Sequence, residues 1–178
     1  VQAAIPIRDF TSGYIVMATR KGTVKKTELS EYSNVRKGGI IAIKLDDGDR
    51  LIGVRRTSGE EHVILGTRQG RAIRFPEKQA RPMGRATYGM RGIRLRGDDV
   101  VVDMVIVPSD LLPPGADEVE EPVEGDTAVV AAAEEPHTGD TGVEVADDAD
   151  AGPEERLALL TVCENGFGKR TPFHEYRT

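Results

Sequence analysis

Lysine and arginine recur at matching positions in three similar stretches of this sequence. The stretches begin at Met17 ("MATRKGTVKKTEL"), Leu65 ("LGTRQGRAIRFPE") and Thr161 ("TVCENGFGKRTPF"). Each has an apolar run, a short turn that closes on a glycine, and a run that carries basic residues. Basic side chains neutralise phosphates and release counterions, so the pattern favours binding of a polyanion such as duplex DNA. The recurring basic positions are Arg20, Lys25, Lys26, Arg68, Arg71, Arg74, Lys169 and Arg170.

A second basic group follows the first two stretches and lies next to glycines. Glycine lets a backbone approach a phosphate closely, so these segments are candidate binding loops. Structural readings of both groups stay open, because exposed charges on strands also prevent aggregation and glycine-rich segments also serve as plain connections. The members of this second group are Arg36, Lys37, Arg85, Arg91 and Arg94.

The formal net charge of -6 hides a strong separation of charge along the chain. Residues 1–108 hold 20 basic and 12 acidic residues, and residues 156–178 hold 4 basic and 2 acidic ones. Residues 109–155 hold 16 acidic residues, no basic residue and no aromatic residue. Such a segment cannot bury a core, so 109–155 is predicted to be a disordered acidic insertion.

Short β-branched runs separated by glycine-containing turns predict an all-β chain. From Gly22 to Gly70 the repeat is 48 residues long, and about four short strands fit into each period. This combination is typical of propeller-like blades. We expect blades in 1–108, the insertion in 109–155 and the start of a further blade in 156–178, as a fragment of a larger disc. The expected strands are 14–19, 23–29, 40–45, 50–56, 62–67, 71–75, 92–95, 100–107 and 157–162.

No group of residues has the spacing of a catalytic centre. The three histidines, His62, His137 and His174, are far apart and lack companion ligands. Cys163 lies in a strand-like run, where we expect a small buried apolar residue. We therefore predict no catalytic residue, no metal site and no cofactor within this chain.

The acidic turn at Asp46, Asp47 and Asp49 has two readings. Its carboxylates could chelate a divalent ion, but a hairpin turn explains aspartate and glycine here without metal, and we favour the turn. No segment is long enough to span a membrane and the single cysteine cannot form an internal disulfide, so we expect a cytoplasmic location.

Three stretches together resemble the C-terminal domain of the DNA gyrase A protein. They are "AIKLDDGDRLIGV" from Ala42, "GIRLRGDDVVVDM" from Gly92 and "NGFGKRTPFHEY" from Asn165. The resemblance implies a β-pinwheel, a disc of blades with exchanged strands whose basic rim wraps duplex DNA. It also implies a place in a type II topoisomerase that drives negative supercoiling with ATP. ATP and Mg²⁺ would then bind elsewhere, and the partners would be the gyrase A N-terminal cleavage domain and the gyrase B protein.

Residues 36–39 resemble part of the gyrase A box, which is tied to DNA wrapping in that family. The two basic residues and two glycines match, whereas Val35, Ile40 and Ile41 depart from the pattern. This segment therefore looks like a degenerate copy of the box. Two alternatives remain from the sequence: the corresponding C-terminal domain of topoisomerase IV, which binds DNA with less wrapping, or a propeller that binds proteins.

Overall fold

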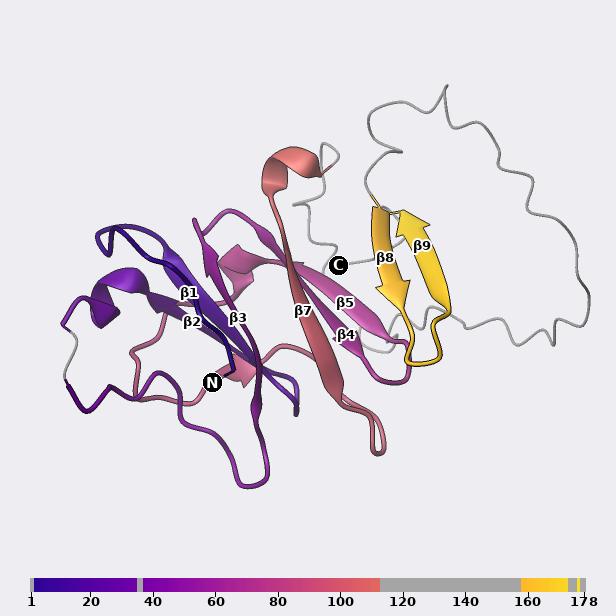
Figure 1. Cartoon of the computed structure of the whole chain (residues 1–178), viewed down its shortest axis with the longest axis horizontal. Coiled ribbons are helices and arrows are strands. Elements are labelled where there is room, and N and C mark those ends of the chain that lie inside the picture. Colours follow the sequence, from indigo (N-terminus) through magenta and orange to yellow (C-terminus); the bar gives the residue numbers. More distant parts are fainter. Residues whose placement is uncertain (1, 35–36, 113–157, 173–175, 177–178) are drawn as a thin grey trace, which may run out of the picture.

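The computed structural model describes residues 2–34, 37–112, 158–172 and 176, and these residues form an all-β structure (Figure 1). The prediction of an all-β chain is confirmed. None of the helical segments in the described part is long and apolar enough to span a membrane. Most of the predicted insertion, 109–155, lies outside the described residues, and its disorder stays a prediction.

The first sheet has four antiparallel strands in the order β3-β1-β2-β6. Strands β1 and β2 form the first hairpin, and β3 pairs with the other side of β1. The elements are β1 (Tyr14–Thr19), β2 (Thr23–Glu28), the 3-10 helix η1 (Leu29–Tyr32), β3 (Leu51–Thr57) and β6 (Met90–Arg91).

The second sheet repeats this arrangement with the order β5-β4-β7, and a third hairpin pairs β8 with β9. Its strand β7 pairs with β4 as β3 pairs with β1. The elements are β4 (His62–Thr67), β5 (Ala72–Pro76), η2 (Glu77–Gln79), β7 (Val101–Val107), η3 (Ser109–Leu111), β8 (Ala158–Val162) and β9 (Gly168–Pro172).

The three hairpins share details that follow from their shared sequence pattern. Their turn glycines, Gly22, Gly70 and Gly166, have φ angles of 87, 79 and 83°, a region that side chains with a Cβ rarely adopt. The register also shifts at matching places, between Ala18 and Thr19 in β1 and between Gly66 and Thr67 in β4. The repeat seen in the sequence is therefore a repeat of structure.

The second repeat completes the sheet of the first repeat. Strand β6 lies beyond β5 in sequence, yet it pairs with β2, and the Met83 amide donates to the Lys26 carbonyl oxygen at 2.8 Å. Gly89 permits this approach, because a Cβ there would lie 2.4 Å from the Val24 carbonyl oxygen. Strand β2 thus has a neighbour on both edges.

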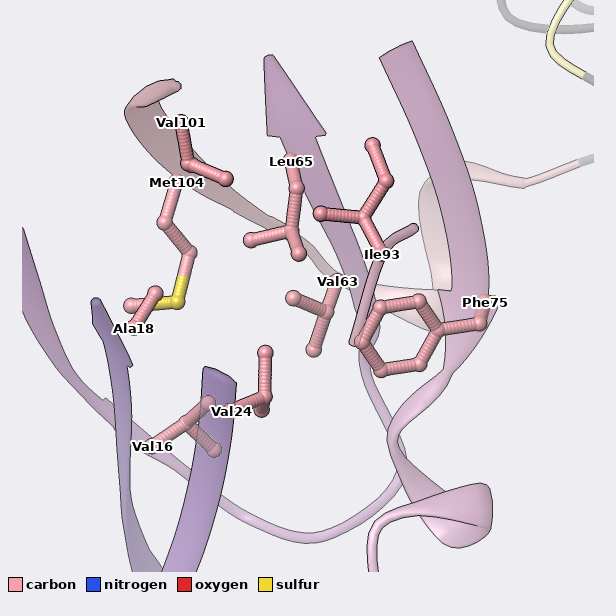
Figure 2. Close-up of a cluster of buried hydrophobic side chains, with 9 residues drawn as sticks. All are labelled: Val16, Ala18, Val24, Val63, Leu65, Phe75, Ile93, Val101 and Met104. Carbon is pink, nitrogen blue, oxygen red and sulfur yellow. The ribbon is translucent and has the colours of Figure 1, made fainter. Parts of the chain in front are cut away.

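The main core lies between the facing sides of the first two sheets (Figure 2). Apolar side chains of β1 and β2 meet those of β4 and β5 there, and their burial from water drives the packing of the sheets. A smaller cluster on the other side of the second sheet joins Ile64 and Val107 to Leu159 of the third hairpin. The main core comprises Val16, Ala18, Val24, Val63, Leu65, Phe75, Ile93, Val101 and Met104.

Two predicted strands, 40–45 and 92–95, are wrong. Residues 40–45 form no strand, and residues 90–91 take the strand position in the second repeat instead. After Met90–Arg91, the Gly92 and Ile93 amides both donate to the Gly22 carbonyl oxygen, which ends the regular ladder. The apolar pattern was read correctly, but strand formation depends on a partner edge that is distant in sequence.

Candidate nucleic-acid interface

Basic residues collect on two connecting segments, 37–44 and 81–91, whose surface we call the connection face. Neither segment contains an acidic residue. The first segment follows η1 in the first repeat and the second follows η2 in the second repeat. The basic residues of the connection face are Lys37, Lys44, Arg81, Arg85 and Arg91.

Two sets of hydrogen bonds hold the two segments together. The Lys44 amide donates to the Thr87 carbonyl oxygen at 3.0 Å. The Lys25 Nζ, from strand β2, donates to the Ala42 carbonyl oxygen at 2.7 Å and to the Arg85 carbonyl oxygen. Connecting segments from two successive repeats are therefore fixed side by side.

The side chains of the connection face are open to solvent. Lys37, Lys44, Arg81 and Arg91 are exposed or partly exposed, and Arg85 is half-buried. The one acidic group within reach that the described residues record is Glu31 of η1, whose Oε2 lies 3.8 Å from Arg85 Nε. This surface has an unbalanced positive charge, which attracts an anionic partner.

An aromatic side chain also lies on the connection face. Tyr88 is 53% exposed, and the Lys44 Nζ lies 5.9 Å from the centroid of its ring. An exposed tyrosine among basic side chains offers a flat apolar surface together with a hydroxyl group. Both features suit contact with the sugars and bases of a nucleic acid.

At the hairpin turns, in contrast, positive charge is matched by aspartate. The Arg68 Nη2 donates to Asp98 Oδ2 at 2.8 Å and to the Asp98 carbonyl oxygen at 2.9 Å. The Gln69 side chain donates to the other carboxylate oxygen of Asp98 at 2.9 Å. In the first repeat, the Lys21 amide donates to Asp49 Oδ1 at 3.0 Å. The polar groups of the turns are thus bonded to neighbouring loops.

Asp99 shows how strongly these turns bind their own carboxylates. Partial burial raises its pKa, but hydrogen bonds from Thr67, Gln69 and Val100, together with the Arg71 charge, outweigh that effect and lower the pKa. The carboxylate therefore stays ionised and supports the turn. Asp49 occupies the matching place in the first repeat and also accepts backbone amides, which is the turn role expected for that acidic cluster.

Proteins of known family match this chain along most of its length. A family model described as DNA gyrase C-terminal domain, beta-propeller, matches residues 13–58, 61–108 and 158–178. The chain belongs to the DNA gyrase C-terminal domain family. The A chain of DNA gyrase from Salmonella typhimurium is 37% identical over 179 residues, covering 100% of this chain and 15% of that protein. Its counterpart in Deinococcus deserti is 40% identical over 166 residues, covering 92% and 15%.

A solved structure supports the same gyrase-type fold. The crystal structure of the C-terminal domain of DNA topoisomerase IV has a TM-score of 0.59 and 34% sequence identity to this chain. It covers 62% of this chain, and this chain covers 35% of it. The propeller-like blades predicted from the sequence are confirmed. The chain spans about 15% of the length of the gyrase A proteins that it matches.

Three predicted site residues of this gyrase-type domain do not lie on an exposed rim. Lys25, Lys26 and Arg74 are 0, 4 and 7% exposed, so the expectation of exposure was wrong for them. The reason lies in the packing of the strands. Strand β2 is an interior strand, and both of its faces are covered by apolar clusters. Alternation that would leave one face of an edge strand in water leaves none here.

The other predicted site residues fall into three groups. Lys37, Arg91 and Arg94 are exposed near the first two repeats, and Arg85 is half-buried beside them. Arg20 and Arg71 are half-buried at the turns, where Arg68 is exposed and paired. Lys169 and Arg170 are exposed on β9 of the third hairpin, far from the connection face in Figure 1, and Arg36 lies outside the described residues.

Three residues of the connection face, Lys44, Arg81 and Tyr88, were not predicted from the sequence. Lys44 was placed within an expected strand, and Arg81 and Tyr88 belong to no repeated pair of basic residues. A signal was nevertheless present, because segments 37–44 and 81–91 are both basic and free of acid in a chain rich in acid. Charge counted by connecting segment would have found them.

Two smaller expectations concern Cys163 and the possible metal site. Cys163 is exposed and lies just after β8, so the expectation of burial was wrong. The strand ends at Val162, and the Cys163 amide closes the turn by donating to the Phe167 carbonyl oxygen at 2.7 Å. Within the described part of the chain, no three His, Cys, Asp or Glu side chains are grouped as metal ligands.

Proposed function

We propose that this chain binds duplex DNA through the connection face and serves as a DNA-wrapping part of a gyrase A protein. The observation that carries the proposal is the exposed, acid-free basic surface built by connecting segments of two successive repeats. Duplex DNA presents a dense line of phosphates, and exposed Lys and Arg gain affinity by releasing its counterions.

The repeat of the fold supports bending of the bound DNA. Each blade places its connecting segment at an equivalent position, so basic groups recur along a surface that turns from blade to blade. DNA that follows such a surface must bend, and its deformation is offset by additional phosphate contacts. In the whole topoisomerase, this wrapping would support ATP-dependent negative supercoiling.

The remaining parts of that reaction belong to other domains. Strand cleavage, ATP and Mg²⁺ would be handled outside this chain, and its protein partners would be the gyrase A N-terminal cleavage domain and the gyrase B protein. Gyrase acts on chromosomal DNA, so the proposed location is the cytoplasm. A second candidate, the corresponding domain of topoisomerase IV, is favoured by the 34% identity to that solved structure. It would bind DNA with less wrapping.

Salt dependence of DNA binding tests the proposed surface. We would substitute alanine singly for Lys37, Lys44, Arg81 and Arg91 in the full chain and measure Kd for a mixed-sequence duplex over a range of salt. Removal of one phosphate contact should reduce the slope of log Kd against log salt by about one. Matched controls are Lys21→Ala and Lys78→Ala, which remove exposed lysines held by Asp47 and Glu60.

The results discriminate among the candidates. Unchanged slopes in all four connection-face variants would overturn the proposed surface, and a larger loss in Arg68→Ala would place DNA at the turns. Binding that ignores salt or requires one short sequence would overturn phosphate-based wrapping. The linking number of nicked circles sealed with bound protein separates the two topoisomerases, because a gyrase domain should shift it and a weakly wrapping domain should not.

A further inference from the structure

We infer that Lys25 is a positioning residue that sets the two segments of the connection face side by side for DNA. This inference rests on the proposed function. The Lys25 side chain is 0% exposed, so it has no access to a phosphate. Its Nζ instead reaches the carbonyl oxygens of Ala42 and Arg85, one in each segment. The amine is a junction between two successive repeats.

The strand register places Lys25 at this junction. It pairs with Met17 across β1 and β2, so its stem lies on the face that carries the Ile15, Met17 and Leu29 cluster. Ala42 and Ile43 pack against the same cluster. The apolar stem of the lysine therefore crosses a buried layer, and its amine emerges beneath the connecting segments. Long lysine stems commonly pack in this way.

Loss of the amine should loosen both segments together. Segments 37–44 and 84–87 contain no strand, so their carbonyl groups have no sheet ladder to bond to. Without Lys25, the Ala42 and Arg85 carbonyl oxygens lose a buried donor, which carries a large penalty for each group. The Lys44 amide bond to Thr87 would then be the weaker remaining link that the structure records between the segments.

This role has a signature that a direct contact lacks. Replacing one phosphate-contacting lysine lowers the salt slope by about one. Loosening both segments would misplace several basic side chains at once, so Lys25→Met should lower the slope by about two or more and weaken DNA binding at least about tenfold at 0.1 M salt. Lys25→Arg keeps a cation with several donors and should retain more binding than Lys25→Met.

The experiment uses the full chain and compares Lys25→Met with Lys25→Arg and Lys26→Met. Lys26 is the matched control, because it is also a buried lysine of β2 but bonds to Glu77 and not to the connecting segments. Amide hydrogen exchange is measured alongside DNA binding. In Lys25→Met, exchange should accelerate in segments 37–44 and 84–91 while β1 and β4 stay protected. In Lys26→Met, these segments and the salt slope should not change.

Each result decides for or against the inference. Unchanged exchange of both segments in Lys25→Met, or a slope change of about one or less, would overturn it even if Lys37→Ala and Arg91→Ala still weaken DNA binding. If those two surface variants have no effect, the proposed DNA surface itself fails. Should Lys25→Met not fold, the Lys44 amide of the unmodified chain decides, since exchange at the rate of an open loop would overturn the inference.

Discussion

Lys26 Nζ and Glu77 Oε1 lie 3.0 Å apart in the interior, and they come from two successive repeats. Their side chains are 5 and 0% exposed. Thr57 donates to the same carboxylate oxygen at 2.7 Å, and the Tyr14 ring centroid lies 4.2 Å from the lysine nitrogen. Burial raises the pKa of Glu77, and the bonds from Thr57 and Lys26 oppose that rise. The pair is thus a polar link between blades inside an apolar core.

Breaking this link from one side should cost more than removing it completely. A buried charge left without its partner destabilises a protein by about 3–5 kcal/mol, whereas replacing both partners with apolar groups is often close to neutral. We expect Lys26→Met and Glu77→Leu each to lower the free energy of unfolding by about 3 kcal/mol. The double variant should lose much less than the sum of the two, as measured by urea denaturation.

The control for this cycle is the exposed pair of Lys78 and Glu60, 2.6 Å apart, with side chains 62 and 67% exposed. Its removal should change stability by less than about 1 kcal/mol, because solvent screens exposed ion pairs. Additive losses in the Lys26 and Glu77 cycle would show that the two residues stabilise the fold independently, contrary to a link between repeats.

Lys25 should make stability depend on pH in the alkaline range. Burial and the Arg85 charge lower its pKa from 10.5 to about 8. Between these values the unfolded chain holds a proton that the folded chain has released, so the free energy of unfolding should rise with pH. The contribution of one such group is at most about 1.4 kcal/mol for each pH unit.

Urea denaturation from pH 7.5 to 9.5 measures this effect, with Lys25→Met as the comparison. The neighbouring charges do not confuse the range, because Arg85 and Glu31 keep their charge and burial raises the pKa of Tyr32 above its usual value. The unmodified chain should gain stability relative to Lys25→Met as pH rises. Parallel pH profiles for the two proteins would contradict the assigned burial of the amine.

Local sequence was sufficient to predict the hairpins. Strands 14–19 and 62–67 begin and end where expected, because an apolar run followed by a glycine turn carries its own partner in the next few residues. Residues 40–45 failed as a strand because the required edge is not close in sequence. A strand exchange like that of β6 is decided by which edge is free, and no local pattern encodes that.

The candidate site was predicted less well, and for a related reason. Lys25 and Lys26 were chosen for their charge and recurrence, but their exposure depends on what covers β2. The exchanged segment and two apolar clusters cover it. Lys37 and Arg91 were identified correctly as surface residues because connecting segments usually lie at the surface. Charge predicts affinity for a polyanion only after packing has decided which charges remain in water.

The acidic insertion should weaken DNA binding at low salt. Residues 109–155 hold 16 acidic residues and no basic residue, and they are tethered to folded residues at Leu112 and Ala158. Tethered negative charge competes with phosphates for basic side chains at a high effective concentration. Deleting 113–155 should therefore raise DNA affinity at low ionic strength, and the gain should shrink above 0.1 M salt, where charges are screened beyond about 10 Å.

A Gly/Ser segment of equal length is the control, since it removes the charge and keeps the tether. It should bind DNA as tightly as the deletion variant. If the original chain and the Gly/Ser variant have equal affinities at low ionic strength, and both are folded, the insertion does not compete with DNA.

Gly89→Ala should detach the exchanged strand from the first sheet. An added Cβ would lie 2.4 Å from the Val24 carbonyl oxygen and 2.6 Å from Thr23 Cγ2, so β6 must move away from β2. We expect a loss of about 1–3 kcal/mol in the free energy of unfolding, because overpacking forces such shifts. Gly84→Ala is the matched control in the same segment, where no atom lies within 4 Å of the added Cβ. Equal stabilities of the two variants in urea denaturation would contradict close packing of β6 on β2.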